Sequence, residues 1–217
     1  MAGTRTLRTP QRLKLPLVAI LRGIQPHEAR AHARRLLDAG FECIEVPTNS
    51  PDWARSVHSI AAFAGSAALV GAGTVLDGRH LDQLQGAGGT LAVSPHTDVA
   101  LIRDAVARGL LCLPGAMTPS EVFAAWHAGA QAVKLFPAAS LGPPHVRSMR
   151  AVLPAELPLL AVGGITPGNL AQYLQAGCDG AGLGSDLYRA GQRPEETAIH
   201  AAAFVQAWHA AATRNRA

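Results

Sequence analysis

Short apolar runs recur along the chain at a nearly constant interval, and the segments between them have a different periodicity. Eight such runs are present: Leu17–Leu21, Cys43–Val46, Ala68–Gly71, Leu91–Val93, Leu111–Leu113, Ala132–Phe136, Leu159–Val162 and Gly180–Gly184. In the intervening segments, apolar residues such as Leu101, Ile102, Ala105 and Val106 recur with the spacing of a helix face. Strands that alternate with helices in this way predict parallel βαβ units.

Glycine and proline mark the boundaries of these predicted elements. A glycine directly after a helix supplies the left-handed backbone of a helix end, and we predict that role just before four of the strands, at Gly40, Gly88, Gly129 and Gly177. A capping residue and a proline favour the first turn of a helix. On that basis helices are expected to begin at Pro26, Ser50-Pro51, Thr118-Pro119 and Thr166-Pro167.

Eight βα units in 217 residues predict a single closed (β/α)8 TIM barrel with short loops, over residues 14–213. An extra C-terminal helix is expected over Pro194–Ala212. The apolar stripe by which it would pack on the barrel wall is Ile199, Ala203, Phe204 and Trp208. A doubly wound open sheet is the alternative, and it is disfavoured because no G-x-G-x-x-G sequence follows a strand.

Composition narrows the class of protein further. The chain is 48% hydrophobic and 16% charged, which excludes a disordered or coiled-coil protein. No apolar run is long enough to span a bilayer, so no membrane association is expected. The first 13 residues contain Arg5, Arg8 and Arg12 without an apolar block, and predict a short disordered tail rather than a secretory signal or a transit peptide.

The cysteines and the net charge bear on location and partners. Cys43, Cys112 and Cys178 form no C-x-x-C pair, which predicts free buried thiols and a cytoplasmic protein. The net charge of +4 is carried by arginines spread over the whole chain, without a basic stripe. Nucleic-acid binding is therefore not expected, and a small anionic substrate suits the positive potential as well.

The strongest candidate for chemistry is Lys134. The chain has 17 arginines and only two lysines, so a lysine inside the strand Ala-Val-Lys-Leu-Phe is unusual. Side-chain alternation directs Val133 and Leu135 to the helices and Lys134 into the lumen, where desolvation lowers the pKa of an amine and favours attack on a carbonyl. Structural pairing with a buried carboxylate, or a position at the barrel rim, is the alternative.

Glu45 is expected on the lumen side of the second strand by the same alternation, because Ile44 and Val46 then face the helices. A carboxyl group within reach of a buried lysine can accept and return protons while a carbinolamine forms and dehydrates. A structural ion pair with Arg22 or Lys134 is the alternative reading.

Active sites of this fold lie at the carboxyl ends of the strands. Glycine-containing segments leave the last two strands, Gly163-Gly164 and Gly184-Ser185, and their backbone N–H groups can approach a phosphate, although tight turns also use glycine. Gly73-Thr74 forms a similar backbone pocket that can bind a carboxylate. Arg22 ends the first strand and supplies either a cation for an acidic substrate or a rim salt bridge.

Metal and serine-hydrolase chemistry are not supported. The nine histidines show no paired-ligand spacing, and neither H-E-x-x-H nor a Cys/His cluster occurs, so neither a metal nor another cofactor is predicted. No G-x-S-x-G surrounds Ser185, which argues against a nucleophilic serine.

Six segments resemble the 2-keto-3-deoxy-6-phosphogluconate/phosphogalactonate aldolase family. In order along the chain they are Pro16-Leu-Val-Ala-Ile-Leu-Arg22-Gly-Ile, Glu45-Val-Pro-Thr-Asn-Ser-Pro, Gly71-Ala-Gly-Thr-Val75, Val133-Lys-Leu-Phe-Pro137, Val162-Gly-Gly-Ile-Thr-Pro and Gly182-Leu-Gly-Ser-Asp-Leu-Tyr-Arg-Ala-Gly191. The resemblance implies a carbon–carbon lyase: a class I aldolase, usually a homotrimer, that cleaves a phosphorylated keto sugar acid to pyruvate and glyceraldehyde 3-phosphate.

The resemblance also assigns roles to residues of this sequence. It implies that Lys134 forms the Schiff base and that Glu45 moves protons. Gly73 and Thr74 are expected to hold the pyruvate carboxylate. The remaining residues expected around the substrate are Arg22 and Pro95, which line the pocket, Phe136, which packs beside the lysine, and Gly163, Gly164, Gly184 and Ser185, which take the phosphate.

Two positions favour the phosphogalactonate branch of this family. The phosphogluconate enzymes resemble one another in having a threonine before the Gly-Gly pair and an arginine in the loop after the second strand, whereas this chain has Val162 and Asn49. A missing hydroxyl group next to the sugar changes how the C4 hydroxyl is recognised. Cleavage of the phosphogluconate epimer or of 4-hydroxy-2-oxoglutarate is the alternative within the family.

Two functions of other classes use the same barrel and glycine loops. A cofactor-free epimerase or isomerase of a sugar phosphate needs no imine, and a non-catalytic sugar-phosphate-binding module needs no turnover. Covalent trapping at Lys134 distinguishes the aldolase from both.

Overall fold

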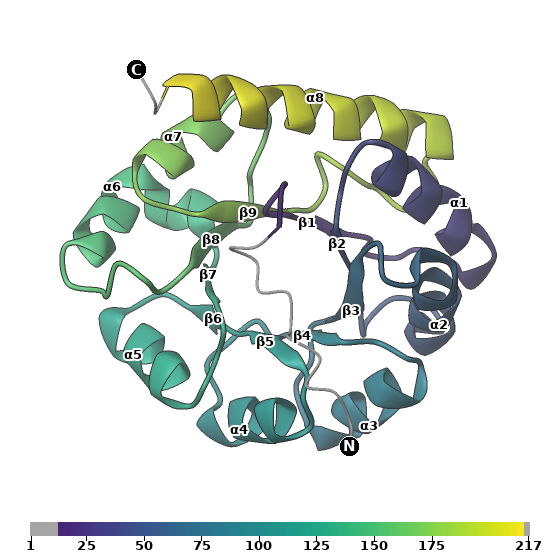
Figure 1. Ribbon diagram of the computed structural model, residues 1–217, viewed down its shortest axis with the longest axis horizontal. Coiled ribbons are helices and arrows are strands. Elements are labelled where there is room, and N and C mark those ends of the chain that lie inside the picture. Colours follow the sequence, from purple (N-terminus) through teal and green to yellow (C-terminus); the bar gives the residue numbers. More distant parts are fainter. Residues whose placement is uncertain (1–12, 215–217) are drawn as a thin grey trace.

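The computed structural model describes residues 13–214 and forms a ring of parallel strands surrounded by helices (Figure 1). The strands are β1 (Leu17–Ile20), β2 (Cys43–Pro47), β3 (Leu69–Gly73), β4 (Leu91–Val93), β5 (Leu111–Leu113), β6 (Gly115–Ala116), β7 (Val133–Leu135), β8 (Leu159–Val162) and β9 (Gly180–Leu183). The helices are α1 (Pro26–Asp38), α2 (Trp53–Ala64), α3 (Gly78–Gly86), α4 (Val99–Ala107), α5 (Pro119–His127), α6 (Ala138–Arg150), α7 (Leu170–Gln175) and α8 (Pro194–Arg214). The predicted TIM barrel is confirmed.

Pro114 divides the fifth barrel strand into two assigned segments. The strands are paired in the order β5-β4-β3-β2-β1-β9-β8-β7-β6, so β5 pairs with β4 on one side and β6 pairs with β7 on the other. Proline has no N–H to donate to a neighbouring strand, whereas its carbonyl still accepts a bond from the Lys134 N–H at 2.9 Å. The described residues therefore contain nine strand segments where the sequence predicted eight.

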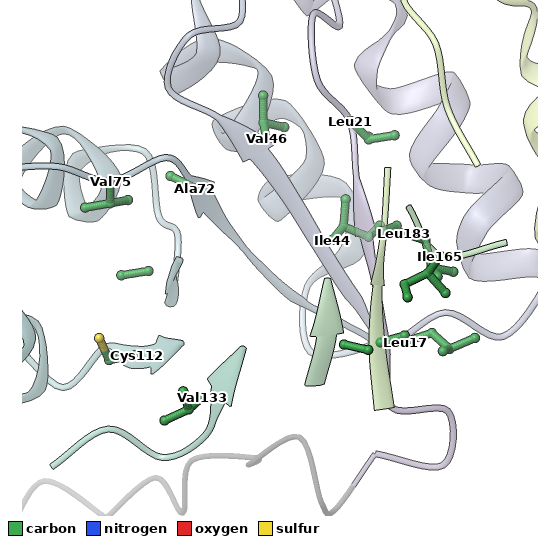
Figure 2. Packing of buried hydrophobic residues seen from close by; sticks show 14 of the residues in the cluster. Leu17, Leu21, Ile44, Val46, Ala72, Val75, Cys112, Val133, Ile165 and Leu183 are labelled. Atoms are coloured by element: carbon green, nitrogen blue, oxygen red, sulfur yellow. The ribbon is translucent and has the colours of Figure 1, made fainter. Parts of the chain in front are cut away.

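Side chains alternate between two apolar clusters. One cluster lies between the strands and the helices, and Figure 2 shows part of it around β1, β2 and β9. In that cluster Ala19 is in register with Ile44 on one side and Leu183 on the other. The second cluster fills the lumen with residues of the opposite parity, including Val18 and Leu160. Strands β1 to β5 and β8 thus contribute to a core on both faces, as is typical of parallel barrel strands.

The predicted helix ends are confirmed, and two of the predicted helix starts are wrong. Gly40, Gly88, Gly129 and Gly177 all have positive φ values directly after a helix. The helices at Pro26 and Pro119 begin as predicted, the second with a capping box between Thr118 and Glu121. By contrast, α2 begins at Trp53 after Asp52 in a left-handed conformation, and α7 begins at Leu170 because Thr166 and Asn169 bond to each other's backbone in a turn.

The predicted tail and the predicted C-terminal helix each differ from the structure at one residue. The predicted disordered tail covers residues 1–13; residues 1–12 lie outside the described residues, and Leu13 is buried in the lumen cluster. The predicted C-terminal helix is present as α8, which packs on α1 and α7 (Figure 1). Phe204 is buried in the barrel wall, but Ile199 is 68% exposed and does not belong to the packing stripe. None of the helices within residues 13–214 is both long and apolar enough to cross a membrane.

Candidate functional site

Lys134 and Glu45 both project into the lumen, as side-chain alternation predicted. Lys134 is the central residue of β7, and its neighbours Val133 and Leu135 belong to the helix-facing cluster. Glu45 lies on β2 between Ile44 and Val46, which face the helices. The exposed fractions of Lys134 and Glu45 are only 6% and 3%. Two ionisable groups are therefore held almost without solvent inside the ring.

The carboxyl group of Glu45 lies against the backbone of Gly73, and one of its two oxygens has no hydrogen-bond partner among residues 13–214. Its Oε2 atom is buried and makes no hydrogen bond with the described residues. A Cβ added at Gly73 would overlap this carboxyl group, so only glycine leaves the space that Glu45 occupies. Burial raises the pKa of Glu45 to about 7, and the charges of Lys134 and Arg22 oppose that rise. The group is poised to exchange a proton near neutral pH.

The same burial acts on Lys134 in the opposite direction. Desolvation lowers the pKa of its amine, the nearby Glu45 opposes this, and Arg22 adds to it. Lys134 Nζ lies 5.1 Å from the centre of the Phe136 ring. Within residues 13–214 no carboxylate lies within ion-pair distance of Lys134, so the structural ion pair considered for Lys134 and Glu45 is not formed. A lysine with a lowered pKa has more free amine available for attack on a carbonyl.

A cavity of about 480 Å³ opens above these two groups at the carboxyl ends of the strands. It is lined by all predicted site residues except Gly73, namely Arg22, Glu45, Thr74, Pro95, Lys134, Phe136, Val162, Gly163, Gly164, Gly184 and Ser185. Gly73 lies behind the Glu45 carboxyl group instead. The strands from opposite sides of the ring thus bring the predicted residues together in one place.

Arg22 is positioned by an amide rather than by a carboxylate. Its Nη1 donates to Asn49 Oδ1 at 2.7 Å, which connects the loop after β1 to the loop after β2. No carboxylate of the described residues pairs with it, so the rim salt bridge considered for this residue is not formed. The arginine therefore keeps its charge and several N–H donors for a ligand.

Thr74 has a φ value of 54°, a conformation that β-branched residues rarely adopt. Bonds on both sides hold it in place: Thr48 Oγ1 donates to the Thr74 carbonyl at 2.6 Å, and the following Val75 N–H donates to the Val93 carbonyl at 3.0 Å. Such strain costs about 1–3 kcal/mol and is common where a backbone must present itself to a ligand.

The two glycine loops lie side by side, since β8 pairs with β9. Gly163 and Gly164 both have positive φ values, and a Cβ on Gly164 would lie 2.5 Å from that of Ala139. Asn169 Nδ2 donates to the Gly164 carbonyl at 2.9 Å and fixes the turn. These backbone conformations and contacts explain why glycine occupies positions 163 and 164. They also leave the backbone that faces the cavity free of side chains.

Sequence reasoning missed five residues that line the cavity: Ile20, Ile165, Asp186, Tyr188 and Arg189. The two isoleucines are ordinary apolar positions without a distinguishing signal. The other three directly follow the predicted Gly184-Ser185 pair, so their place at the carboxyl end of β9 is the signal that identifies them. Among residues 13–214, no three His, Cys, Asp or Glu side chains are arranged to hold a metal ion.

The fold and the site place the chain among the barrel enzymes whose cavity opens at the carboxyl ends of parallel strands. Residues 10–202 match the "KDPG and KHG aldolase" family, and the chain belongs to that family. This confirms the resemblance found in the six sequence motifs.

Individual relatives cover almost the whole chain. It is 52% identical to 2-dehydro-3-deoxy-6-phosphogalactonate aldolase of Escherichia coli (strain K12) over 198 residues, 91% of this chain and 97% of the relative. A solved structure described as native KDPGal matches with a TM-score of 0.91 and 52% identity, over 92% of this chain and 97% of that one. A designed cage built by fusing symmetric oligomeric domains matches with a TM-score of 0.92 and 51% identity, over 94% of this chain and 75% of that one.

We predict that Thr74→Gly stabilises the fold by about 1 kcal/mol, because glycine adopts positive φ without strain. The measurement is the free energy of unfolding in urea. Thr90→Gly is the matched control: Thr90 does not have a positive φ, so the same change there should destabilise the protein by a similar amount. A loss of stability in both variants would contradict the assignment of strain to Thr74.

We also predict that the difference in free energy of unfolding between Glu45→Gln and the wild type depends on pH. Since the folded protein raises the pKa of Glu45 from 4.5 to about 7, Glu45 favours folding most below pH 4.5, and this advantage is lost as the pH rises to about 7. The free energy of unfolding of the variant relative to the wild type should therefore rise by about 3 kcal/mol over this interval and then level off.

Two comparisons control the pH prediction. In a Lys134→Met background the rise should be larger, because the amine that lowers the pKa of Glu45 is gone. Glu121→Gln should be nearly flat between pH 4.5 and 7 and change with the opposite sign below pH 4.5, because bonds from the Met117 backbone and the Thr118 side chain lower the pKa of Glu121 and the wild type loses this contribution only as the pH falls. A difference for Glu45→Gln that is flat between pH 4.5 and 7 would refute the raised pKa.

Proposed function

We propose that the protein is a class I aldolase that cleaves 2-dehydro-3-deoxy-6-phosphogalactonate to pyruvate and D-glyceraldehyde 3-phosphate. The observation that carries the proposal is the placement of an amine with a lowered pKa and a carboxyl group with a raised pKa in one buried lumen. The names of the relatives support the substrate class and the C4 configuration.

The reaction begins at Lys134. Its neutral Nζ attacks the C2 carbonyl carbon, and the carbonyl oxygen takes up a proton to give a carbinolamine. Loss of that hydroxyl group as water, with a proton returned by Glu45, leaves an iminium ion whose positive charge withdraws electrons from C2. A carboxyl group whose pKa is about 7 can serve both as acid and as base in these steps at neutral pH.

Cleavage follows from the iminium ion. Glu45, directly or through a water molecule, removes the proton of the C4 hydroxyl group. The C3–C4 bond then breaks, its electron pair moves toward the iminium nitrogen, and the aldehyde leaves with its phosphate. The remaining enamine takes a proton at C3, and water hydrolyses the resulting iminium to release pyruvate and the free amine. Every proton and electron pair is returned, so no cofactor is needed.

The rest of the cavity fixes the two ends of the substrate. The strained Thr74 backbone is assigned to the carboxylate end, with Arg22 supplying positive charge and Pro95 and Phe136 forming walls, while Gly73 leaves the space that the Glu45 carboxyl group occupies. The phosphate is assigned to the backbone N–H groups of Gly163, Gly164 and Gly184 and to Ser185. Holding both anionic ends orients the C3–C4 bond and lowers the entropic contribution to the activation barrier.

The context of the enzyme belongs to the same proposal. One domain over residues 14–213 carries the activity. A homotrimer is proposed, supported by the similarity to a cage assembled from symmetric oligomeric domains. The cytoplasm is the proposed location, since Cys43, Cys112 and Cys178 are all buried free thiols.

Borohydride reduction in the presence of pyruvate tests the imine. We expect irreversible inactivation and a pyruvate adduct on Lys134, and Lys134→Arg should lose both the adduct and, roughly a thousandfold or more, the cleavage activity. The chain offers a matched control, because Lys14 is its other lysine. Lys14→Arg should label and turn over like the wild type. Activity without an adduct would favour an epimerase or isomerase, and ligand-induced thermal stabilisation without turnover would favour a binding module.

A side-by-side assay of the two C4 epimers tests the substrate. We expect kcat/KM to favour the galactonate epimer, because Val162 offers the C4 region no hydroxyl partner. Val162→Thr should shift the ratio of kcat/KM toward the gluconate epimer by roughly tenfold. Val152→Thr, an exposed position outside the cavity, is the control and should leave the ratio unchanged. A wild-type preference for the gluconate epimer would overturn the substrate assignment.

A further inference from the structure

The loop between β9 and α8 carries a cation that the phosphate end of the cavity otherwise lacks. The groups already assigned to the phosphate are backbone N–H groups and one hydroxyl group, all uncharged. Of the cations that line the cavity, Lys134 is buried on β7, and Arg22 is bonded to Asn49 beside β1 and β2. The remaining cation is Arg189, which lies four residues after Ser185 on the same loop.

The guanidinium of Arg189 is oriented by its own loop and keeps donors free. Its Nε donates to the Ser185 carbonyl at 2.9 Å, which holds the side chain across the loop that begins with Gly184. No carboxylate of residues 13–214 lies within ion-pair distance of it. The two terminal nitrogens are therefore available for the paired, charge-assisted bonds that a guanidinium makes with a phosphate.

The backbone at Arg189 is held by a side chain farther along the loop. The Arg189 N–H donates to Gln192 Oε1 at 2.9 Å. Gln192 Nε2 in turn donates to the Leu187 carbonyl at 3.0 Å and to Thr197 Oγ1 at 2.6 Å. One amide group thus closes the loop on itself and attaches it to the first turn of α8.

A buried histidine continues this chain of contacts to helix α1, which packs against α8. His32 Nδ1 lies 2.8 Å from Thr197 Oγ1, and both residues are fully buried. The His32 ring also packs edge to face against Tyr188, a residue that lines the cavity. Tyr188 donates to Glu28 Oε1 at 3.1 Å. Helix α1 therefore supports the loop at two points through contacts that avoid the reacting amine.

We propose that Arg189 is a phosphate-binding residue of this site and that Gln192, Thr197 and His32 are positioning residues that hold it there. The inference rests on the proposed function, because it takes the phosphorylated end of the substrate to lie between the two glycine loops. The recognised group is a phosphate monoester dianion, for which a fork of N–H donors with a fixed charge is a matched partner.

Steady-state kinetics with the phosphorylated substrate and its unphosphorylated counterpart test Arg189. For Arg189→Gln we expect KM for the phosphorylated substrate to rise roughly tenfold with little change in kcat, because a partly exposed charge-assisted contact is lost from binding. KM for the unphosphorylated counterpart should not change. Arg193→Gln is the matched control: it removes the same charge four residues away, where Arg193 lies outside the cavity and near Glu196.

The positioning residues are tested by removing one hydroxyl group. Thr197→Val keeps the shape of the side chain but deletes the partner of both Gln192 and His32, so KM for the phosphorylated substrate should rise while KM for the unphosphorylated one stays constant. Thr197→Ser restores the hydroxyl group and should restore KM. Gln192→Leu provides a second variant, because it removes the side chain that joins the Arg189 N–H to Thr197. It should reproduce the effect of Thr197→Val.

The results separate this inference from the proposed function. Borohydride trapping with pyruvate involves no phosphate, so Lys134 should be labelled equally in the wild type and in every loop variant. Equal labelling combined with an unchanged KM in Arg189→Gln would overturn the role of Arg189 and leave the aldolase intact. Equal increases in KM for both substrates would overturn it as well, because the loss would then be structural. A wild-type protein without labelling would refute the aldolase itself.

Discussion

The burial of one amine and one carboxyl group in the same water-poor lumen is the constraint on which the site depends. Desolvation disfavours both charges, so it lowers the pKa of Lys134 and raises that of Glu45, while their mutual attraction limits both shifts. The barrel provides this environment because its strand alternation directs both side chains inward and leaves their neighbours in the outer core. Gly73 supplies the remaining requirement, since any larger residue would displace the carboxyl group.

The two ends of the cavity are built by different means. The reacting end consists of residues within strands, whose positions follow from the register of β2, β3 and β7. The other end consists of loops after β8 and β9, whose positions follow from positive-φ glycines and side-chain bonds to the backbone. Strand register cannot slip without moving a whole core face, whereas a loop is adjustable residue by residue. The proposed function thus places the chemistry on the rigid part and the recognition of the leaving fragment on the adaptable part.

The sequence predicted the barrel and most of the site because both depend on local periodicity. Alternation along two strands identified Lys134 and Glu45, and helix-ending glycines located the starts of other strands. Contacts between distant segments explain the misses. Two helices start later than their prolines because a left-handed Asp52 and a turn between Thr166 and Asn169 precede them. Arg189 follows the Gly184-Ser185 pair at the carboxyl end of β9, but its residue type did not distinguish it, since the chain has 17 arginines.

Helix α8 connects closure of the ring to support of the site. It follows the last strand and packs on α1, the first helix, so it covers the junction between β9 and β1 where the two ends of the barrel meet (Figure 1). In such a position an apolar surface would suffice for packing, yet a buried hydroxyl group at Thr197 and a buried imidazole at His32 occur there. A buried polar pair lowers stability unless its bonds are made, and His32 Nε2 is buried without a hydrogen-bond partner among the described residues. The bonds that the pair does make lead to the loop that borders the cavity. Their presence at the junction is therefore better explained by the geometry that they impose on that loop than by closure of the barrel alone.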